Sequence, residues 1–367
     1  RKMSVFNVEL EAFVIPDDHT VWKVSPGKTY RFYRAVAASS FIFPDIRGLE
    51  GLQSKPANWQ DDDVLKQISS DRYAREQNNV ANGGSAVPRS HVVKSDKETL
   101  TFANRIWKEA KLGDLVVVPA DGYDKDVMIG MIVSAPGVIE EVSATDGTHT
   151  GKYFGRRVKW LHSEPKFELD GELIKALHAR AAVYALEEKL KESIYRLAFG
   201  NFTYKGHYVA EFRTEKKHFT AEDAAVVTAW LNGFQVLHHK LGGTFNLSSI
   251  PSFAALGLAP LPDAYAGELK ININSPGEIF IRTAGPLALS LMALFSLSGC
   301  DSSAVVNQGV TIKLQSVAGA AAGEEAAVKA DIEGLANALG EQRLAEANDL
   351  AQRAAKDAKV STRAKVN

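Results

Sequence analysis

The chain has 367 residues, a formal net charge of −1 and 45% hydrophobic residues. This length is too great for one small domain and predicts two or three domains with packed cores. The near-neutral charge excludes a chain that is basic overall, so any contact with nucleic acid has to come from a local cluster.

Cysteine use and the first residues bear on the compartment. Cys300 is the single cysteine, so no disulfide forms within the chain, which is typical of a reducing cytoplasm. The opening residues RKMSVF lack the apolar core of a secretory signal. We therefore expect a cytoplasmic protein.

The first block of the chain is rich in strand-like segments. FNVELEAFVI places Phe6, Val8 and Leu10 on one face, as a half-buried strand does. A turn at SPGK precedes TYRFYRAV (29–36), which predicts a second strand. The polar, glycine-containing segment Glu76–Pro88 predicts a flexible loop.

A short helix and three further strands follow. TFANRIWKEA (101–110) has the apolar spacing of a helix, and LVVVP (115–119) is an apolar strand that ends at a proline. VMIGMIV (127–133) and YFGRRVKWL (153–161) complete the set. We expect these strands to form a barrel.

The hydrophobic period changes after this block. Between Gly171 and Leu197 apolar residues recur at helical spacing, which predicts one long amphipathic helix. This helix is expected to connect the two halves of the chain.

The second block mixes strands and helices. A hairpin is expected around Lys205 and Gly206, and Thr220 is expected to cap a helix that ends near Lys240. Further strands are predicted at LKINI (269–273), IFIRT (279–283) and GVTIKLQ (309–315).

One uncharged segment, AGPLALSLMALFSL (284–297), complicates a fully soluble interpretation. It is shorter than the roughly 20 residues that span a bilayer. The residues LSGC (297–300), in which it ends, resemble a lipoprotein signal, which belongs at an N-terminus. A core helix, an oligomer interface and a membrane-active helix all stay open. The side chains that would make oligomer or membrane contacts are Leu287, Leu289, Leu291, Leu294 and Phe295.

The last segment is alanine-rich and predicts a helix with a thin apolar stripe. Such a helix is marginal alone, so we expect it to pack on a partner chain or to fray. A homo-oligomer is therefore expected. The predicted divisions are a barrel domain (1–163), a connecting helix (164–198), an α+β assembly domain (199–317) and a helical tail (318–367).

The sequence lacks the common catalytic and metal-binding motifs. The dinucleotide and phosphate-loop fingerprints, the G-x-S-x-G elbow and H-E-x-x-H do not occur. His238 and His239 are adjacent near a helix end, where the helix dipole favours them. Asp61–Asp63 is typical of a helix start. The sequence favours a non-enzymatic protein, and we expect no catalytic residue, metal or cofactor.

The predicted strand 153–161 carries the candidate ligand-binding residues, which are Tyr153, Arg156, Arg157, Lys159 and Trp160. Arginine binds phosphate through two parallel hydrogen bonds, and aromatic faces stack bases. Alternation places Arg157 and Lys159 on one face, and Arg156 and Trp160 on the other. An edge strand with solvated charges is the competing interpretation.

The order of GDLVVVP (113–119), IGMIV (129–133) and YFGRRVKWL (153–161), within residues 102–161, resembles PUA-like and EVE-like domains. Such domains stand at the front of bacterial Mrr-type restriction proteins. The resemblance implies a β-barrel that binds a modified base or RNA in an aromatic cage, without catalysis. It also implies a role in bacterial anti-phage defence.

We therefore predict an α+β protein with an N-terminal PUA-like β-barrel, a long connecting helix, and a C-terminal α+β domain with a helical tail. The predicted function is non-enzymatic sensing of a nucleic acid or nucleotide by an oligomeric defence protein. A ligand-gated, membrane-associated effector that uses helix 285–297 is one alternative. A structural or assembly protein is the other.

Overall fold

The chain divides into two compact units in the computed structural model. Residues 18–198 form one unit, here called the half-barrel unit, and residues 1–17 with 199–367 form the other, here called the split unit. Each is described by itself. The structure describes residues 6–84, 91–146, 150–241, 252–263, 266–272, 277–300, 305, 309–317 and 321–366.

The first strand, β1 (Phe6–Val14), belongs to the split unit. It pairs in parallel with β13 (Val310–Ser316) and β9 (Asn201–Tyr204), and antiparallel with β15 (Ala364–Val366). The strand prediction is confirmed, with Val8 and Leu10 buried. The predicted domain 1–163 is wrong, because the main-chain partners of β1 come from the other end of the sequence.

The sheet of the split unit has eight strands. The predicted hairpin is confirmed, because Lys205 and Gly206, with φ of 49° and 73°, turn β9 back into β10 (His207–Thr214). The strand order is β11 (Glu268–Asn272), β12 (Gly277–Ala284), β10, β9, β1 and β13, with β14 (Val360–Thr362) paired to β10 and β15 to β1. Residues 273–276, which include part of one predicted strand, lie outside the described residues.

Two further helices belong to this unit. The helix α6 (Ala221–Leu241) begins with a reciprocal cap, as predicted for Thr220. Thr220 Oγ1 accepts a hydrogen bond from the Asp223 amide at 3.3 Å, and the Asp223 carboxylate accepts one from the Thr220 amide at 2.7 Å. The five-residue α7 (Phe253–Gly257) packs on α6.

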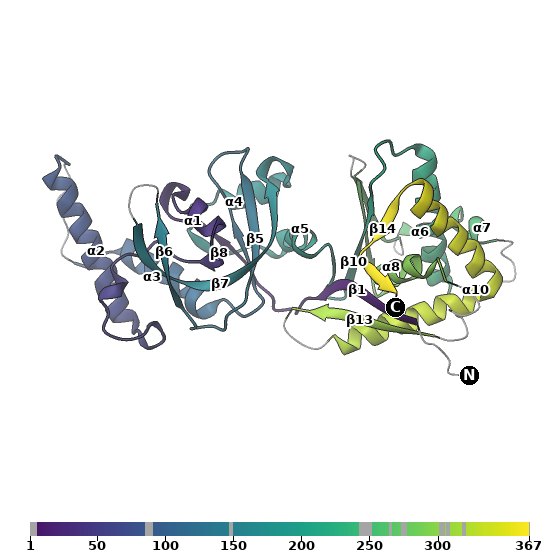
Figure 1. The fold of residues 1–367 in the computed structure, drawn as a ribbon, viewed down its shortest axis with the longest axis horizontal. Coiled ribbons are helices and arrows are strands. Elements are labelled where there is room, and N and C mark those ends of the chain that lie inside the picture. The colour runs from purple at the N-terminus through teal and green to yellow at the C-terminus, as the bar shows by residue number, and fades with distance from the viewer. Residues whose placement is uncertain are drawn as a thin grey trace. The chain divides into compact units, whose positions relative to one another are not determined.

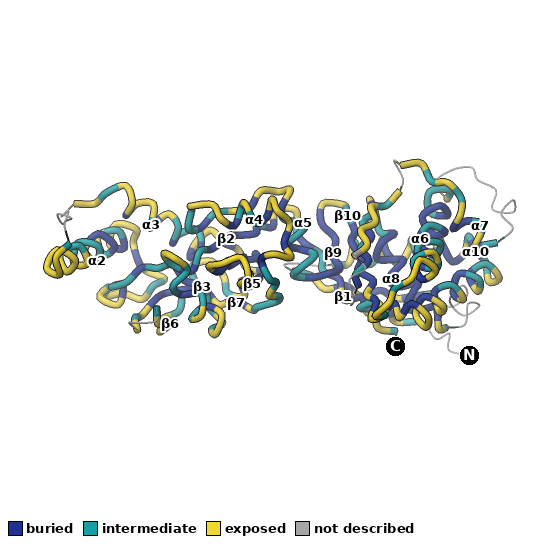
Figure 2. Tube along the Cα trace, turned by 90° about the horizontal axis from the view of Figure 1, so that it is seen from above, coloured by how far each residue is buried: buried dark blue, intermediate teal, exposed yellow. Residues whose placement is uncertain are grey.

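The apolar segment forms α8 (Leu287–Leu297), which is the core of the split unit. It lies between β10 on one side and α10 (Ala322–Asp357) on the other, and Figure 2 shows it as a buried segment. The predicted oligomer or membrane contacts are wrong, because each of the five side chains is already covered by this chain: Leu287, Leu289, Leu291, Leu294 and Phe295 are at most 7% exposed. In the described part of the chain, no helix has the length and apolarity needed to cross a membrane.

The alanine-rich tail is also part of this core. Val328, Ile332 and Leu335 of α10 are buried against α6, α8 and β13. Gly340, with φ of 66°, bends the helix, and the chain then returns to the sheet as β14 and β15. The prediction that the tail packs on a partner chain or frays is therefore wrong.

The half-barrel unit is built around the long strand β7 (Thr150–Pro165). Along its length β7 pairs with β6 (Glu140–Thr145), then with β3 (Phe41–Ile42), then with β5 (Asp126–Ile132). This change of partners curls the sheet into a half-barrel (Figure 1). The full order is β3, β7, β5, β4 (Leu115–Val118), β2 (Val21–Val24) and β8 (Val183–Ala185), with β6 on β7. The strands predicted for this region at 115–119, 127–133 and 153–161 are confirmed.

The segment predicted as a second strand forms helical turns instead. A 3-10 turn (Lys28–Tyr30) leads into α1 (Tyr33–Ala37). Phe32 and Val36 are four residues apart and both fully buried, so the apolar spacing of this segment is that of a helix.

Residues 61–109 of the half-barrel unit are more helical than predicted. The helix α2 (Asp61–Ala81) occupies the first part of the predicted loop 76–88, and residues 85–90 lie outside the described residues. The predicted helix 101–110 is confirmed as the end of α3 (Lys94–Asn104) and a π-helical turn (Arg105–Glu109).

The predicted long connecting helix is wrong. The structure has α4 (Gly171–Leu177), then the strand β8, then α5 (Glu188–Phe199). The main chain of β8 pairs with β2, with Ala185 opposite Trp22. A helix satisfies its own main chain, so pairing with a sheet edge interrupts it there.

The burial of α8 predicts how the split unit responds to truncation. Leu291 is fully buried, whereas Leu258 after α7 is 84% exposed. We expect Leu291→Ala to lower the free energy of unfolding by about 3 kcal/mol, and Leu258→Ala to change it by less than about 0.5 kcal/mol. Urea unfolding in detergent-free buffer measures both. Equal effects of the two substitutions would contradict the core position of α8.

Candidate anion-binding site

Arg156, a predicted ligand-binding residue, is fully buried in the half-barrel unit. Its guanidinium donates hydrogen bonds to the carbonyls of Ile106 and Ala110 and to Ser134 Oγ, each at 2.9 Å. Burial lowers the pKa of Arg156 to about 10. The side chain joins the end of the π-helical turn to β7, so it holds the fold together and does not face a ligand.

Tyr153, another predicted ligand-binding residue, is also fully buried. Its ring stacks on Phe43, with 5.1 Å between centroids, and meets Phe32 edge to face at 4.8 Å. Trp107 is buried too and donates to the Phe154 carbonyl at 2.9 Å. The rings of Tyr153, Phe43 and Phe32 thus pack against one another in the core, and Trp107 meets Trp59 edge to face at 6.1 Å.

Arg157, Lys159 and Trp160 lie nearer the surface of β7. Arg157 pairs with Glu140 at 2.6 Å and lies 4.9 Å from the ring centroid of Phe41. Lys159 is exposed, and half-buried Trp160 donates to the Ser39 carbonyl at 2.6 Å. The predicted alternation is confirmed for Arg157 and Lys159 against Arg156. The five predicted residues are therefore divided between the core and the surface.

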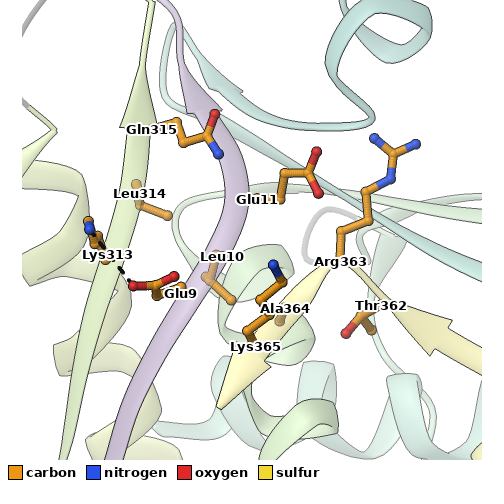
Figure 3. A pocket seen from close by; sticks show the side chains of 10 residues that line it. All are labelled: Glu9, Leu10, Glu11, Lys313, Leu314, Gln315, Thr362, Arg363, Ala364 and Lys365. Carbon is orange, nitrogen blue, oxygen red and sulfur yellow. Dashed lines mark ion pairs between the residues drawn. The ribbon is translucent and has the colours of Figure 1, made fainter. Parts of the chain in front are cut away.

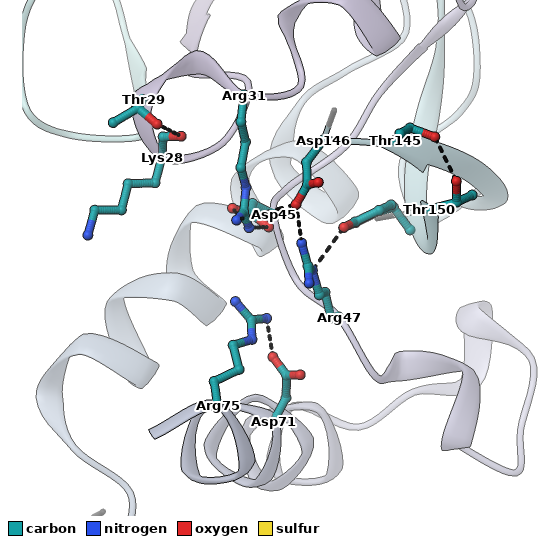
Figure 4. A network of polar contacts seen from close by, with 11 residues as sticks. Lys28, Thr29, Arg31, Asp45, Arg47, Asp71, Arg75, Thr145, Asp146 and Thr150 are labelled. Carbon is teal, nitrogen blue, oxygen red and sulfur yellow. Dashed lines mark hydrogen bonds and ion pairs between the residues drawn. The ribbon is translucent and has the colours of Figure 1, made fainter. Parts of the chain in front are cut away.

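A different group of cations comes together at one end of the half-barrel. Arg31 donates two hydrogen bonds to Asp45, at 2.6 and 2.7 Å. Arg47 donates to Asp146 at 2.6 Å and, through Nε, to the hydroxyl of Tyr153 at 3.0 Å. Figure 4 shows the two guanidinium groups converging on these carboxylates from separate loops. We call Arg31, Arg47, Arg75 and Lys28 the arginine network.

The core fixes the position of these arginines. The Arg31 guanidinium lies 5.0 Å from the ring centroid of Phe32, which packs on Tyr153. In the segment after β3, Ile46 is buried, so its neighbours Asp45 and Arg47 point outward. Both arginines are about 27% exposed (27% and 28%), so they are held in place while staying open to solvent.

The loop that carries Lys28 is strained. Thr29 and Tyr30 have φ of 53° and 55°, in the left-handed region that β-branched and bulky residues avoid. Each costs about 1–2 kcal/mol. The Thr29 hydroxyl donates to the Lys28 carbonyl at 2.6 Å, and the exposed Lys28 side chain extends away from the Arg31 guanidinium (Figure 4). Strain of this kind is common where a loop presents a functional group.

The helix α2 borders the network. Arg75 forms an ion pair with Asp71, and Arg72 donates to Asp96 at 2.9 and 3.0 Å. A cavity of about 190 Å³ lies between these residues and Asp45. Its wall is completed by Ile46, Ile68, Ser95 and Thr99. Arg72 and Arg75 line this cavity together with Asp45, Asp71 and Asp96, so it carries both signs of charge. Arg31 and Arg47 do not line it, and their forked guanidinium groups are the ones that suit a phosphate or carboxylate group.

Sequence reasoning missed the arginine network. Arg31, Arg47 and Arg75 are separated by many residues, and Asp146 lies 99 residues after Arg47. The local signals were the turn SPGK before Arg31 and the alternation in DIR at 45–47. Neither shows that the two loops meet.

The split unit has a separate pocket of about 450 Å³, drawn in Figure 3. It lies where the register of β1 and β13 shifts between Glu9 and Phe13. Glu9 pairs with Lys313 at 3.8 Å, and Glu11, Arg363 and Lys365 complete the charged wall. Both signs of charge occur side by side, so the pocket selects no single class of ligand.

Other candidate residues have ordinary structural partners. His162 pairs with Glu164 at 2.6 Å, and Asp61 at the start of α2 accepts from Lys108 at 2.5 Å. Cys300 is partly exposed, and burial raises the pKa of its thiol. Within the described ranges, no group of histidine, cysteine and acidic side chains is arranged to hold a metal.

Comparisons with protein-family models, with curated proteins and with solved structures found no match for this chain. The resemblance to PUA-like domains, the nucleic-acid or nucleotide partner and the homo-oligomer therefore stay predictions. The coarse architecture stands on the structure itself. It is a mixed α+β protein with a curled half-barrel sheet and a C-terminal helix.

Adjacent arginines on β7 provide a matched pair for testing the structural role of Arg156. Replacing Arg156 with Ala leaves buried carbonyls without donors and opens a cavity, so we expect a loss of about 3 kcal/mol in the free energy of unfolding. Arg157→Ala removes the same charge from the surface and is expected to cost less than about 1 kcal/mol. Chemical denaturation measures both. Equal losses would contradict the assignment.

His238 on α6 predicts a pH dependence of the split unit. Its Nε2 lies 3.2 Å from Asp331 Oδ1 on α10, and this hydrogen bond raises the pKa of His238, although burial opposes it. The pair therefore stabilises the fold below the unfolded pKa of about 6.5, and this stability is lost as pH rises through the folded pKa. The unfolding free energies of the wild type and His238→Gln are expected to differ at pH 5.5 and to converge by pH 8.5. A constant difference would contradict the pairing.

Proposed function

We propose that the half-barrel unit recognises the phosphate groups of a nucleic acid or nucleotide at the arginine network. The observation that carries the proposal is the convergence of Arg31 and Arg47, which come from separate loops and rest on the buried ring cluster of Phe32 and Tyr153. Pre-positioned guanidinium groups lose little side-chain entropy when they bind an anion.

The aspartates around the network fit this function. Asp45 and Asp146 hold the guanidinium groups in one geometry when no ligand is bound. An incoming phosphate competes with these carboxylates for the same donors, so binding is expected to be moderate and strongly dependent on salt. Lys28 at the border is exposed, and Arg75 is exposed and paired with Asp71.

The surface of β7 gives a control within the same unit. Arg157 and Lys159 are exposed cations that the sequence suggested as ligand-binding residues. Removing them changes the charge of the unit by the same amount as removing Arg31 and Arg47. A comparison of the two double variants therefore separates a specific site from general electrostatic attraction.

The test measures binding of a fluorescein-labelled 20-nucleotide single strand, its duplex and a labelled nucleotide by fluorescence anisotropy. We expect R31A/R47A to weaken binding about tenfold or more. The slope of log K against log salt is expected to fall by about 1.5, since two phosphate contacts are lost. R157A/K159A is expected to stay within about twofold of the wild type. Thermal unfolding of each variant checks that the fold is intact.

Two outcomes would overturn the proposal. The first is the absence of binding by the wild-type protein to any of the three probes at low salt. The second is loss of binding by R157A/K159A while R31A/R47A binds as tightly as the wild type, which would place the interface on β7. The variant R31K/R47K keeps the charge and removes the forked geometry, so intermediate binding by it supports recognition by guanidinium groups.

A further inference from the structure

Two exposed aromatic rings stand together on the half-barrel unit. Tyr123, in the loop between β4 and β5, is 59% exposed, and Phe167, after the end of β7, is 50% exposed. Their ring centroids are 6.4 Å apart with an angle of 42° between the planes. Exposure of two adjacent aromatic rings to water is energetically unfavourable. Such an exposed apolar patch often marks an interaction site.

The local structure holds both rings outward. The residue before Phe167 is Lys166, whose side chain is 1% exposed and donates to the Ala120 carbonyl at 2.6 Å. Lys166 also lies 5.9 Å from the ring centroid of Tyr30. Because Lys166 is anchored inward, Phe167 is directed to solvent. Gly122, with φ of 90°, turns the chain just before Tyr123.

Acidic residues flank the two rings in the sequence. Asp121, Asp124, Asp126 and Glu168 are all exposed next to them in sequence. Lys125, which lies 3.7 Å from Asp124, is the exposed cation of this segment, and Lys166 is buried. A carboxylate-rich border repels a polyanion and attracts a cation.

We propose that Tyr123 and Phe167, with this acidic border, form a docking surface for a basic peptide segment of a partner protein. An arginine or lysine side chain placed over the two rings lies within the roughly 6 Å at which a cation is attracted to a ring face. The carboxylates of Asp121, Asp124 and Glu168 then meet neighbouring basic residues. Charge complementarity selects this partner over a nucleic acid, which the arginine network is suited to bind.

This inference goes beyond the proposed function and does not depend on it. In the arginine network Arg31 and Arg47 are paired with Asp45 and Asp146, whereas the aromatic surface is bordered mainly by carboxylates. The half-barrel unit thus presents two surfaces of different chemistry, one of forked guanidinium donors and one of aromatic rings with carboxylates. Loss of one is not expected to affect binding at the other.

The experiment uses the full chain and a labelled ten-residue peptide of alternating arginine and glycine, with a glutamate–glycine peptide of equal length as the probe control. Fluorescence anisotropy is expected to show binding of the basic peptide and none of the acidic one. Tyr123→Ala and Phe167→Ala are each expected to weaken binding about fivefold. Asp124→Asn is expected to weaken it by about twofold to threefold. The matched controls Leu112→Ala and Val138→Ala remove exposed apolar side chains elsewhere in this unit and are expected to have no effect.

Three results would overturn the inference. They are failure of the wild-type protein to bind the basic peptide, equal binding by the wild type and the double variant Y123A/F167A, and equal weakening by the Leu112 and Val138 controls. An oligonucleotide whose binding requires Tyr123 and Phe167 would also overturn it, because it would show that the rings stack bases. Thermal unfolding of each variant confirms that the loops lie on an intact fold.

Discussion

Hydrogen bonding of β1 to strands from the other end of the chain is the constraint that organises this protein. The parallel ladders with β13 and β9 and the antiparallel ladder with β15 fix the N-terminal segment in the sheet of the split unit. Residues 18–198 then have to fold as an insertion between β1 and β9. A strand in the middle of a sheet needs partners on both edges, so the split unit is complete only when both ends of the chain have joined it.

Burial of α8 and α10 follows from this sheet. One face of the sheet is covered by α8, and α10 covers α8 in turn, with Gly340 allowing the long helix to bend around it. These layers explain why α8 is apolar on all sides and why α10 has only a thin apolar stripe. A helix needs apolar residues all round only when neighbours surround it.

In the half-barrel unit, buried cations join distant segments through main-chain carbonyls. Arg156 joins β7 to the π-helical turn, Lys166 joins the end of β7 to Ala120, and Lys23 donates to the carbonyls of Ala179 and Ala181 at 3.1 and 2.8 Å. Burial lowers the pKa of Lys23 to about 8. These buried cations are used for structure, whereas the arginine network and the exposed aromatic rings stay open to partners.

Residue patterns by themselves determined the strands 115–118 and 126–132, the hairpin at Lys205–Gly206 and the cap at Thr220, because each depends on neighbours in sequence. They also separated Arg157 and Lys159 from Arg156. Predictions from sequence patterns were wrong where contacts with a distant segment determine the local structure. Residues 183–185 are helical by spacing, yet they pair with β2, and Arg156 is basic, yet carbonyls of another element bury it. The arginine network is of the same kind, because only the tertiary structure brings Arg31 and Arg47 together: the burial of Phe32, Ile46 and Tyr153 in one core directs both guanidinium groups to the same side.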